Sequence, residues 1–226
     1  MLTNNCKNCN NKCFFYKMLP EEEVDMHLTK LITIKYKKKE TLLKQNSHSS
    51  HLIFVQKGLV KVFTERRNEK NIIIDIIHSN RFIGITDLNS DNNNYSAVAL
   101  KDSDICLIPK EGFIDVLRKN LGFAKLFYNL QSNYHTYLIN KLTSLGTKQM
   151  HGRLADVIIY LCSSEFNTED IYSFITRKEI SELSGMSPES AIRLLTEFKN
   201  DGLISMDGKK ISINNLELLN RLSEIG

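Results

Sequence analysis

The chain has 226 residues, of which 42% are hydrophobic, and its formal net charge at pH 7 is +4. This length and composition suit two modest folded domains and argue against global disorder. The apolar runs are too short to span a bilayer, and the small positive charge does not by itself identify a nucleic-acid partner. We therefore expect a folded cytoplasmic protein with no membrane partner.

The first segment, residues 1–19, is rich in cysteine and opens on polar residues, so no secretory signal is expected. Three of the chain's five cysteines, Cys6, Cys9 and Cys13, follow a C-x2-C-x3-C pattern. An odd cysteine count argues against a disulfide framework, whereas thiolates spaced this closely chelate metals well. A metal site here needs a fourth ligand from elsewhere in the chain.

Residues 20–112 are predicted to form short β-strands separated by turn clusters. Strands are expected at residues 32–36, 59–63, 72–77, 95–100 and 105–109, with a polar loop at 89–94. Because no helical pattern interrupts them, the segment predicts a small antiparallel barrel or jelly roll.

Residues 113–146 change to a helical pattern, with apolar residues recurring every three or four positions up to a break near Gly146. The expected seam is formed by Phe123, Phe127, Leu130, Tyr134, Tyr137 and Lys141. Its width and aromatic content favour pairing with the same helix of a second subunit. Packing of the helix on its own barrel is the open alternative.

Residues 147–226 begin with a helix at 148–164 and then show the signals of two short helices joined by a turn. Thr176 and Glu179 have the spacing of a capping box, and Gly185 suits a sharp turn. Ser187 and Pro188 are typical of the start of the next helix. This pattern predicts a helix-turn-helix.

The helix after Pro188 is expected to point Ile192, Leu195 and Phe198 inward. Two alternating runs then flank Asp207–Gly208–Lys209, which is a strong hairpin signal. The hairpin would supply the wing of a winged helix-turn-helix.

The side chains of this element suit DNA. Arg193 can donate two hydrogen bonds to guanine, and Glu189 can accept one from cytosine, with Ser190 on the same outward face. Contacts to phosphates are expected from Thr176, Arg177, Lys178 and Ser187. A three-helix module for protein contacts is the alternative, but the complete set of caps, glycine turn and wing favours DNA.

This organisation resembles the CRP/FNR superfamily of bacterial regulators over nearly the whole chain, most specifically at residues 175–180 and 185–193. The resemblance implies an α+β fold with a cyclic-nucleotide-binding-like β-roll, a long dimerisation helix and a C-terminal winged helix-turn-helix. It also implies a homodimer that binds palindromic double-stranded DNA and contacts RNA polymerase. In the family, the residues at the positions of Glu189 and Arg193 read a TGA core. The catabolite-activator branch carries a base-reading Arg at the position of Pro188, and the FNR branch carries a Ser at the position of Ile192. These departures leave the outer bases of the DNA half-site open.

Cyclic-AMP-binding members of this superfamily hold the ribose with a Glu and the phosphate with an Arg. The matching positions here look like Ile85 and Tyr95. Burial of a phosphate without a cation is costly, so cyclic AMP binding is not expected.

The resemblance extends to the cysteines, since FNR-type oxygen sensors hold a 4Fe-4S cluster with three N-terminal cysteines and one from the β-roll. It implies Cys6, Cys9, Cys13 and Cys106 as ligands and a response to oxygen or nitric oxide. The gap between Cys9 and Cys13 is shorter than in FNR, so a zinc site and free thiols stay open. The alternative function is a regulator that senses a small organic effector in the β-roll without a cluster. No enzyme is expected, because no nucleophile–base pair or glycine-rich phosphate loop is present.

Overall fold

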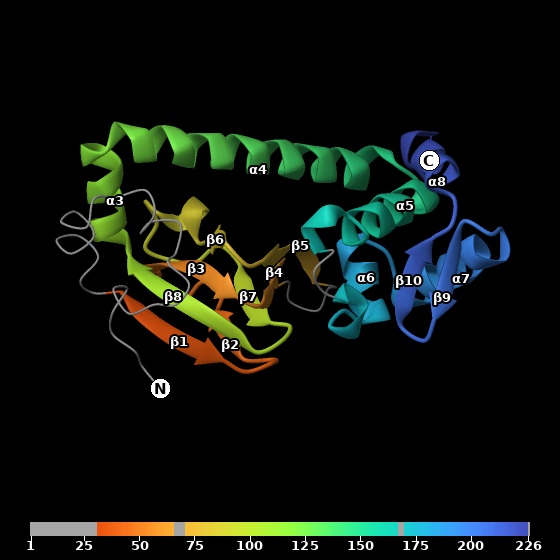
Figure 1. The fold of residues 1–226 in the computed structure, drawn as a ribbon, viewed down its shortest axis with the longest axis horizontal. Helices are drawn as coiled ribbons and strands as arrows, with labels where there is room; N and C mark the ends of the chain where they lie inside the picture. The colour runs from red at the N-terminus through yellow and green to blue at the C-terminus, as the bar shows by residue number, and fades with distance from the viewer. Residues whose placement is uncertain (1–30, 66–70, 167–169, 226) are drawn as a thin grey trace. The chain divides into compact units, whose positions relative to one another are not determined.

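The computed structural model describes residues 31–65, 71–166 and 170–225, which form two compact units (Figure 1). One unit contains strands β1 to β4, β5 from Asp75 onward, strands β6 to β8, helix α3 and helix α4 as far as Tyr134. The other contains α4 from His135 onward and the later elements, together with β5 up to Ile74.

The first unit is a β-roll of two four-stranded sheets, with strand orders β1-β8-β3-β6 and β2-β7-β4-β5 (Figure 1). The pairings β1–β8, β3–β8, β3–β6, β2–β7 and β4–β7 are antiparallel, which confirms the predicted jelly roll. The strands are β1 (Ile32–Tyr36), β2 (Thr41–Leu43), β3 (His51–Lys57), β4 (Leu59–Thr64), β5 (Ile72–His78), β6 (Arg81–Ile83), β7 (Ser96–Ala99) and β8 (Ser103–Pro109).

Three of these strands, β2, β3 and β6, were not predicted. In β3 the four residues from Leu52 to Val55 are all buried, so the strand lacks the alternation that marks a half-buried strand. Strands β2 and β6 have only three residues each, too few to show a period. The five predicted strands match β1, β4, β5, β7 and β8.

The tight connection between β3 and β4 depends on Gly58. Its φ of 132° lies in a region that residues with a Cβ rarely adopt. A Cβ at this position would also lie 2.8 Å from the Cα of Ser103. The hydroxyl of Ser103 accepts a hydrogen bond from the backbone N–H of Leu59 at 3.3 Å, so the two segments are in close register.

The predicted single helix over residues 113–146 is two helices, α3 (Lys110–Lys119) and α4 (Leu121–Thr147). Asn120 separates them with an extended backbone, and its Oδ1 accepts a hydrogen bond from the N–H of Phe123 at 2.9 Å. The predicted break near Gly146 is confirmed, because α4 ends at Thr147, one residue beyond it.

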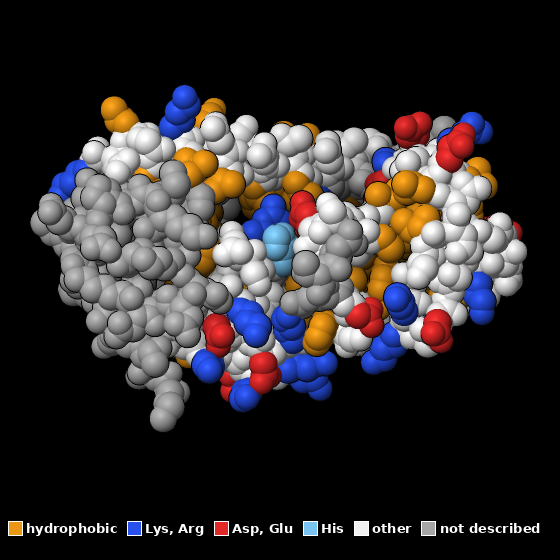
Figure 2. Space-filling model, in the orientation of Figure 1, with side chains coloured by type: hydrophobic (Ala, Val, Ile, Leu, Met, Phe, Trp, Pro, Cys, Tyr) orange, Lys and Arg blue, Asp and Glu red, His pale blue; other side chains and the backbone are white. Residues whose placement is uncertain are grey.

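Part of the expected seam on α4 faces the roll. Phe123 and Phe127 belong to a buried apolar cluster with Phe54 of β3 and Phe113 of α3. This half of the helix therefore packs on its own roll, which was the alternative to intersubunit pairing. Leu130 of the expected seam is exposed, together with four large apolar side chains that were not part of it: Leu121, Tyr128, Ile139 and Leu142. Figure 2 shows orange side chains along the edge where Figure 1 draws α4.

The second unit contains helices around a two-stranded antiparallel sheet. Besides the second half of α4, its elements are α5 (Met150–Leu161), the 3-10 turns η3 (Ser164–Phe166) and η4 (Ile171–Ser173), α6 (Arg177–Leu183), α7 (Pro188–Asn200), β9 (Ile204–Asp207), β10 (Lys210–Ile213) and α8 (Leu216–Ile225). The predicted helix at 148–164 is shorter in the structure, and α8 was not predicted. Within the described ranges, none of the helices has the length and apolar character required to cross a membrane.

Candidate nucleic-acid interface

Helix α6 begins at the capping box that the sequence predicted. The backbone N–H of Glu179 donates to Oγ1 of Thr176 at 3.2 Å, and the N–H of Thr176 donates to Oε2 of Glu179 at 2.8 Å. Oγ1 of Thr176 also donates to that carboxylate at 3.0 Å. The hydroxyl predicted to contact phosphate is therefore already engaged in the cap.

The turn between α6 and α7 is built around Gly185, whose φ is 63°. The N–H of Met186 donates to the carbonyl of Ser181 at 3.0 Å, which closes the end of α6. A Cβ on Gly185 would lie 2.8 Å from Cδ2 of Leu145, so glycine is needed for both its backbone angle and its close packing.

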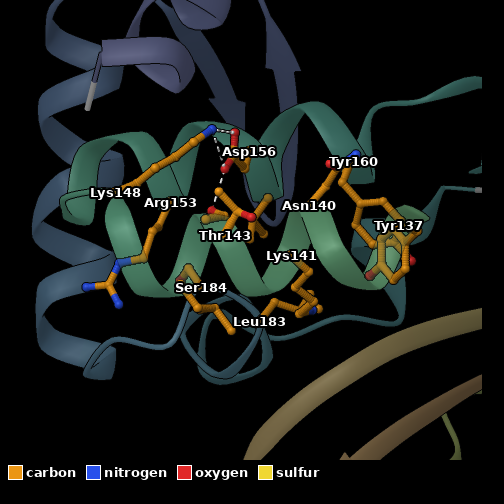
Figure 3. Close-up of a pocket in the computed structure, with 13 residues that line it drawn as sticks. Tyr137, Asn140, Lys141, Thr143, Lys148, Arg153, Asp156, Tyr160, Leu183 and Ser184 are labelled. Carbon is orange, nitrogen blue, oxygen red and sulfur yellow. Dashed lines mark hydrogen bonds and ion pairs between the residues drawn. The ribbon is translucent and has the colours of Figure 1, made fainter. Parts of the chain in front are cut away.

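A cavity of about 380 Å³ lies next to this turn, between α4, α5 and the end of α6 (Figure 3). On one side Nζ of Lys148 pairs with the carboxylate of Asp156 at 2.9 Å. That carboxylate also accepts hydrogen bonds from Ser144 and Ser223. On the other side the guanidinium of Arg153 donates to the carbonyl of Gly185 at 3.3 Å. These contacts join α4, α5 and α8 to the helix-turn-helix.

Helix α7 begins at Ser187, whose Oγ accepts a hydrogen bond from the N–H of Ser190 at 3.1 Å, with Pro188 at the first helical position. This confirms the predicted cap. The hydroxyl of Ser190 is hydrogen-bonded to that of Ser187 at 3.1 Å and is half-buried. Ser190 therefore takes part in the cap network, although it was expected to point outward.

The inward face of α7 is formed by Ala191, Leu194, Leu195 and Phe198. The prediction that Ile192 points inward was wrong, because its side chain is 51% exposed. Leu194, at 0% exposed, lies inward. The three- and four-residue spacing of a helical core face is satisfied by 191, 194, 195 and 198, which leaves position 192 outside it.

The outward face of α7 presents Glu189, Ile192 and Arg193. The side chain of Arg193 is 61% exposed, and its guanidinium lies 3.7 Å from the carboxylate of Glu197. Glu197 also contacts Nε2 of His151 on α5 at 3.0 Å. A surface pair of this kind contributes little to stability, so it leaves Arg193 able to change partners.

The hairpin β9–β10 forms the predicted wing, with Gly208 in its turn at a φ of 56°. Arg177 was expected to contact phosphate, but its guanidinium donates to the carbonyl of Gly208 at 3.4 Å and to Sδ of Met206 at 3.6 Å. Partial burial lowers the pKa of this guanidinium, which stays charged at neutral pH. Arg177 thus connects α6 to the wing.

The cations that remain exposed near α6 and the wing are Lys178, Lys209 and Lys210. Lys178 is 74% exposed and lies 3.9 Å from Glu182. Lys209 and Lys210 were not among the predicted contact residues, although their position beside the Asp-Gly turn could have identified them. The structure therefore leaves three lysines with the solvent exposure that phosphate contacts require.

In the roll, the segment that would match a cyclic-nucleotide site holds a different set of contacts. The N–H of Gly84 donates to the hydroxyl of Tyr95 at 2.7 Å, and burial raises the pKa of Tyr95 to about 12. The carboxylate of Asp87, which is completely buried, accepts a hydrogen bond from Asn94. The ammonium of Lys110 donates to the backbone carbonyl of Asp87, so a cation also lies beside this segment. The absence of cyclic AMP binding, expected from Ile85 and Tyr95, stays a prediction.

Of the predicted metal ligands, Cys6, Cys9 and Cys13 lie outside the described residues. Cys106 lies in β8, is 3% exposed, and is paired in register with Thr33 of β1, whose Oγ1 is 3.6 Å from the sulfur. Leu31, at the start of the described chain, belongs to the same buried cluster as Cys106. The 18 residues from Cys13 to Leu31 can extend roughly 60 Å, so the chain can bring the four thiols together.

Comparisons with known proteins match both units. The cyclic nucleotide-binding domain family matches residues 33–120, and the Crp-like helix-turn-helix domain family matches residues 152–222. The fumarate nitrate reduction regulatory protein of Klebsiella oxytoca is 26% identical over 211 residues, which cover 91% of this chain and 84% of the relative. The fumarate and nitrate reduction regulatory protein of Escherichia coli strain K12 has the same identity and coverage.

Solved structures share the fold. FixK2 from Bradyrhizobium japonicum superposes with a TM-score of 0.74 at 15% identity, over 84% of this chain and 96% of that protein. A transcriptional regulator of the crp/fnr family from Eubacterium rectale gives a TM-score of 0.72 at 18% identity, over 93% and 98% of the two chains. The β-rich first unit, long helix and helix-turn-helix are thus those of this structural group.

Proposed function

The chain belongs to the CRP/FNR superfamily of transcription regulators, and from this premise we propose that it binds a palindromic DNA site as a homodimer through α7. The observation that carries the proposal is the outward face of α7. Glu189 can only accept hydrogen bonds when ionised, and Arg193 can only donate them. A helix of 13 residues that presents both next to its capped N-terminus has the chemistry to read cytosine and guanine edges in a major groove.

The proposed phosphate contacts keep one of the residues first expected, Lys178, and add Lys209 and Lys210. Lys178 at the start of α6 and Lys209 and Lys210 on the wing are exposed and can neutralise phosphates on either side of the groove. Thr176, Ser187 and Arg177 act instead by holding the two helices and the wing in position. The division predicts that the lysines contribute affinity and salt dependence, while Glu189 and Arg193 contribute sequence preference.

Dimerisation is proposed on the exposed stripe of α4. Leu121, Tyr128 and Leu142 are 83%, 72% and 73% exposed, and successive positions among them are seven and fourteen residues apart. Ile139, at 62% exposed, lies three residues before Leu142. This is the a/d spacing of a two-stranded coiled coil, and it belongs to the face of α4 that does not pack on the roll. A twofold dimer would give the protein two copies of α7 for two half-sites.

For the signal, we propose that the thiolates of Cys6, Cys9, Cys13 and Cys106 hold a 4Fe-4S cluster, which would make the regulator sensitive to oxygen or nitric oxide. Two observations support the fit of this donor set. Cys106 shares a buried cluster with Leu31, where the chain from the other three cysteines enters the roll. That cluster also contains Phe123 and Phe127 of α4. An ordered N-terminal segment at this cluster would therefore influence the helix that carries the exposed stripe.

Sequence-specific DNA binding is tested by selecting bound sequences from a random double-stranded DNA library, with full-length protein purified without oxygen. The proposal predicts recovery of a two-fold symmetric site with G·C pairs in each half, at half-site centres about 10 base pairs apart or a multiple of this. A retained pool without a shared sequence would reject it. A site that depends on an added small organic effector, bound by metal-free protein, would favour the alternative signal.

A further inference from the structure

The cavity between α4, α5 and the end of α6 has one apolar end and one charged end. Its volume of about 380 Å³ is enough for a small organic molecule, and the residues that line it all belong to the second unit. Figure 3 shows the rings of Tyr137 and Tyr160 at one end and Arg153 at the other. The centroids of the two rings are 5.6 Å apart. The apolar walls are completed by Leu145, Val157 and Leu183.

The charges around this cavity do not balance. Lys141, Lys148 and Arg153 are cations, whereas Asp156 is the only carboxylate among the described residues that line it. Asp156 pairs with Lys148 at 2.9 Å and also accepts hydrogen bonds from two serines. Its negative charge is therefore compensated within the wall. Lys141 and Arg153 give the cavity a surplus of positive charge, which favours an anion as its occupant.

The guanidinium of Arg153 has a donor that the described part of the chain does not match. One terminal nitrogen donates to the carbonyl of Gly185 at 3.3 Å. Its Nε is shielded from solvent, and none of the described residues accepts a hydrogen bond from it. A guanidinium N–H without an acceptor is unfavourable, and a carboxylate can accept from two guanidinium nitrogens at once. An organic carboxylate would therefore supply the acceptor that this end of the cavity needs.

We propose that the cavity binds a small organic acid, whose carboxylate pairs with Arg153 and whose apolar body contacts Tyr137 and Tyr160. Nζ of Lys141 lies 5.9 Å from the centre of the Tyr137 ring and adds a second attractive charge. The apolar walls suit such a body better than they suit a strongly hydrated inorganic anion. The bound acid would contact α4, α5 and the end of α6, and so would stabilise the second unit.

The cavity lies on a different face of α4 from the exposed stripe. Tyr137, Lys141 and Ser144 are spaced by four and three residues, which places them on one face of the helix. Ile139 and Leu142 of the stripe are offset from that face. The proposed dimer would therefore leave the cavity open. The inference goes beyond the proposed function and does not depend on DNA binding.

The test uses full-length protein and two probes that differ in charge, 3-phenylpropionate and the neutral 3-phenylpropionamide. Binding is measured by titration with saturation-transfer NMR. The acid should bind saturably with a dissociation constant of a few millimolar or lower, the affinity expected for a ligand of this size. The amide should bind about tenfold more weakly, because it cannot form the charged pair with Arg153.

Two variants and a matched control locate the acid. Arg153→Gln should lower the affinity about tenfold, and Lys141→Gln, which removes a more distant charge, about threefold. Arg221→Gln removes an exposed arginine on α8 that does not line the cavity, and it should bind like the wild type. Arg153→Gln also loses the hydrogen bond to Gly185, so its fold is checked by circular dichroism. Lys141→Gln keeps that bond and provides the decision if Arg153→Gln does not fold.

Several results would overturn the inference. Absence of saturable binding, or equal affinity for the acid and the amide, would show that the cavity selects no anion. Wild-type affinity in folded Arg153→Gln, or in Lys141→Gln if the first variant is unfolded, would place the bound acid elsewhere. An equal loss for Arg221→Gln would assign binding to the general charge of the protein. None of these results affects the DNA selection, so failure of the proposed function is distinguishable.

Discussion

The helix-turn-helix of the second unit and the roll of the first unit position their functional residues in different ways. In the helix-turn-helix, caps and a glycine turn fix the helices, and each of these contacts joins residues only a few positions apart. In the roll, Cys106 lies beside Thr33 across a strand pair that joins residues 73 positions apart. The first arrangement depends on local signals and the second on tertiary packing, so the two regions should respond differently to substitution.

The largest expected effect concerns the packing of the roll. Gly58→Ala should lower the free energy of unfolding by roughly 3 kcal/mol or more, because it adds backbone strain and a clash with Ser103. The matched control is Gly202→Ala in the second unit, where φ is 72° but nothing lies within 4 Å of the added Cβ. It should cost only about 1 kcal/mol. Equal losses in urea denaturation would show that backbone angle alone, and not the close approach, determines the requirement at Gly58.

The next expected effect is on the affinity and sequence preference of DNA binding rather than on the stability of the fold. Arg193→Ala should weaken binding to the selected site by about 1–3 kcal/mol per half-site and relax the preference at one base pair. Arg221→Ala is the matched control, because Arg221 on α8 is also exposed and forms a similar ion pair with a glutamate four residues away. The control should bind like the wild type. An equal loss for Arg193→Ala on random DNA would assign this residue to phosphate.

The exposed stripe of α4 can be tested by the oligomeric state. Leu142→Glu should weaken the dimer by roughly tenfold or more, about 1.4 kcal/mol, because association would bury a carboxylate against its symmetry mate. Leu216→Glu, at a similarly exposed apolar position on α8, should leave the dimer unchanged. Sedimentation velocity over a concentration series distinguishes these outcomes. A monomeric wild type, or a dimer that tolerates Leu142→Glu, would contradict the proposed interface.

The smallest effect is that of a single cap. Thr176→Ala should destabilise the second unit by about 1 kcal/mol, because it removes the side-chain oxygen that accepts from Glu179. Thr176→Ser keeps that oxygen and should retain most of the stability. Specific DNA affinity should fall with the population of folded protein and no further. A larger loss of affinity than of stability would show that Thr176 contacts DNA as first expected.

The same comparison explains what the sequence could predict. The capping box at Thr176, the cap at Ser187 and the wing turn at Gly208 were all predictable, since each depends on residues next to one another in the chain. The direction of Ile192 and the partner of Arg177 were not, because these depend on which side of α7 meets the core and on where the wing folds back. Likewise, only packing distinguishes the face of α4 that covers the roll from the exposed stripe.

The regulatory claim is that the cysteines of the first unit control DNA reading by the second. Its most direct test is the affinity of anaerobically purified protein for the selected site before and after exposure to air, with iron and sulfide measured in the same sample. We expect iron- and sulfide-containing protein whose binding weakens in air. Cys106→Ser should bind weakly in both conditions, and Cys162→Ser should behave like the wild type. Equal affinities before and after air, for the wild type and for Cys106→Ser alike, would contradict the account.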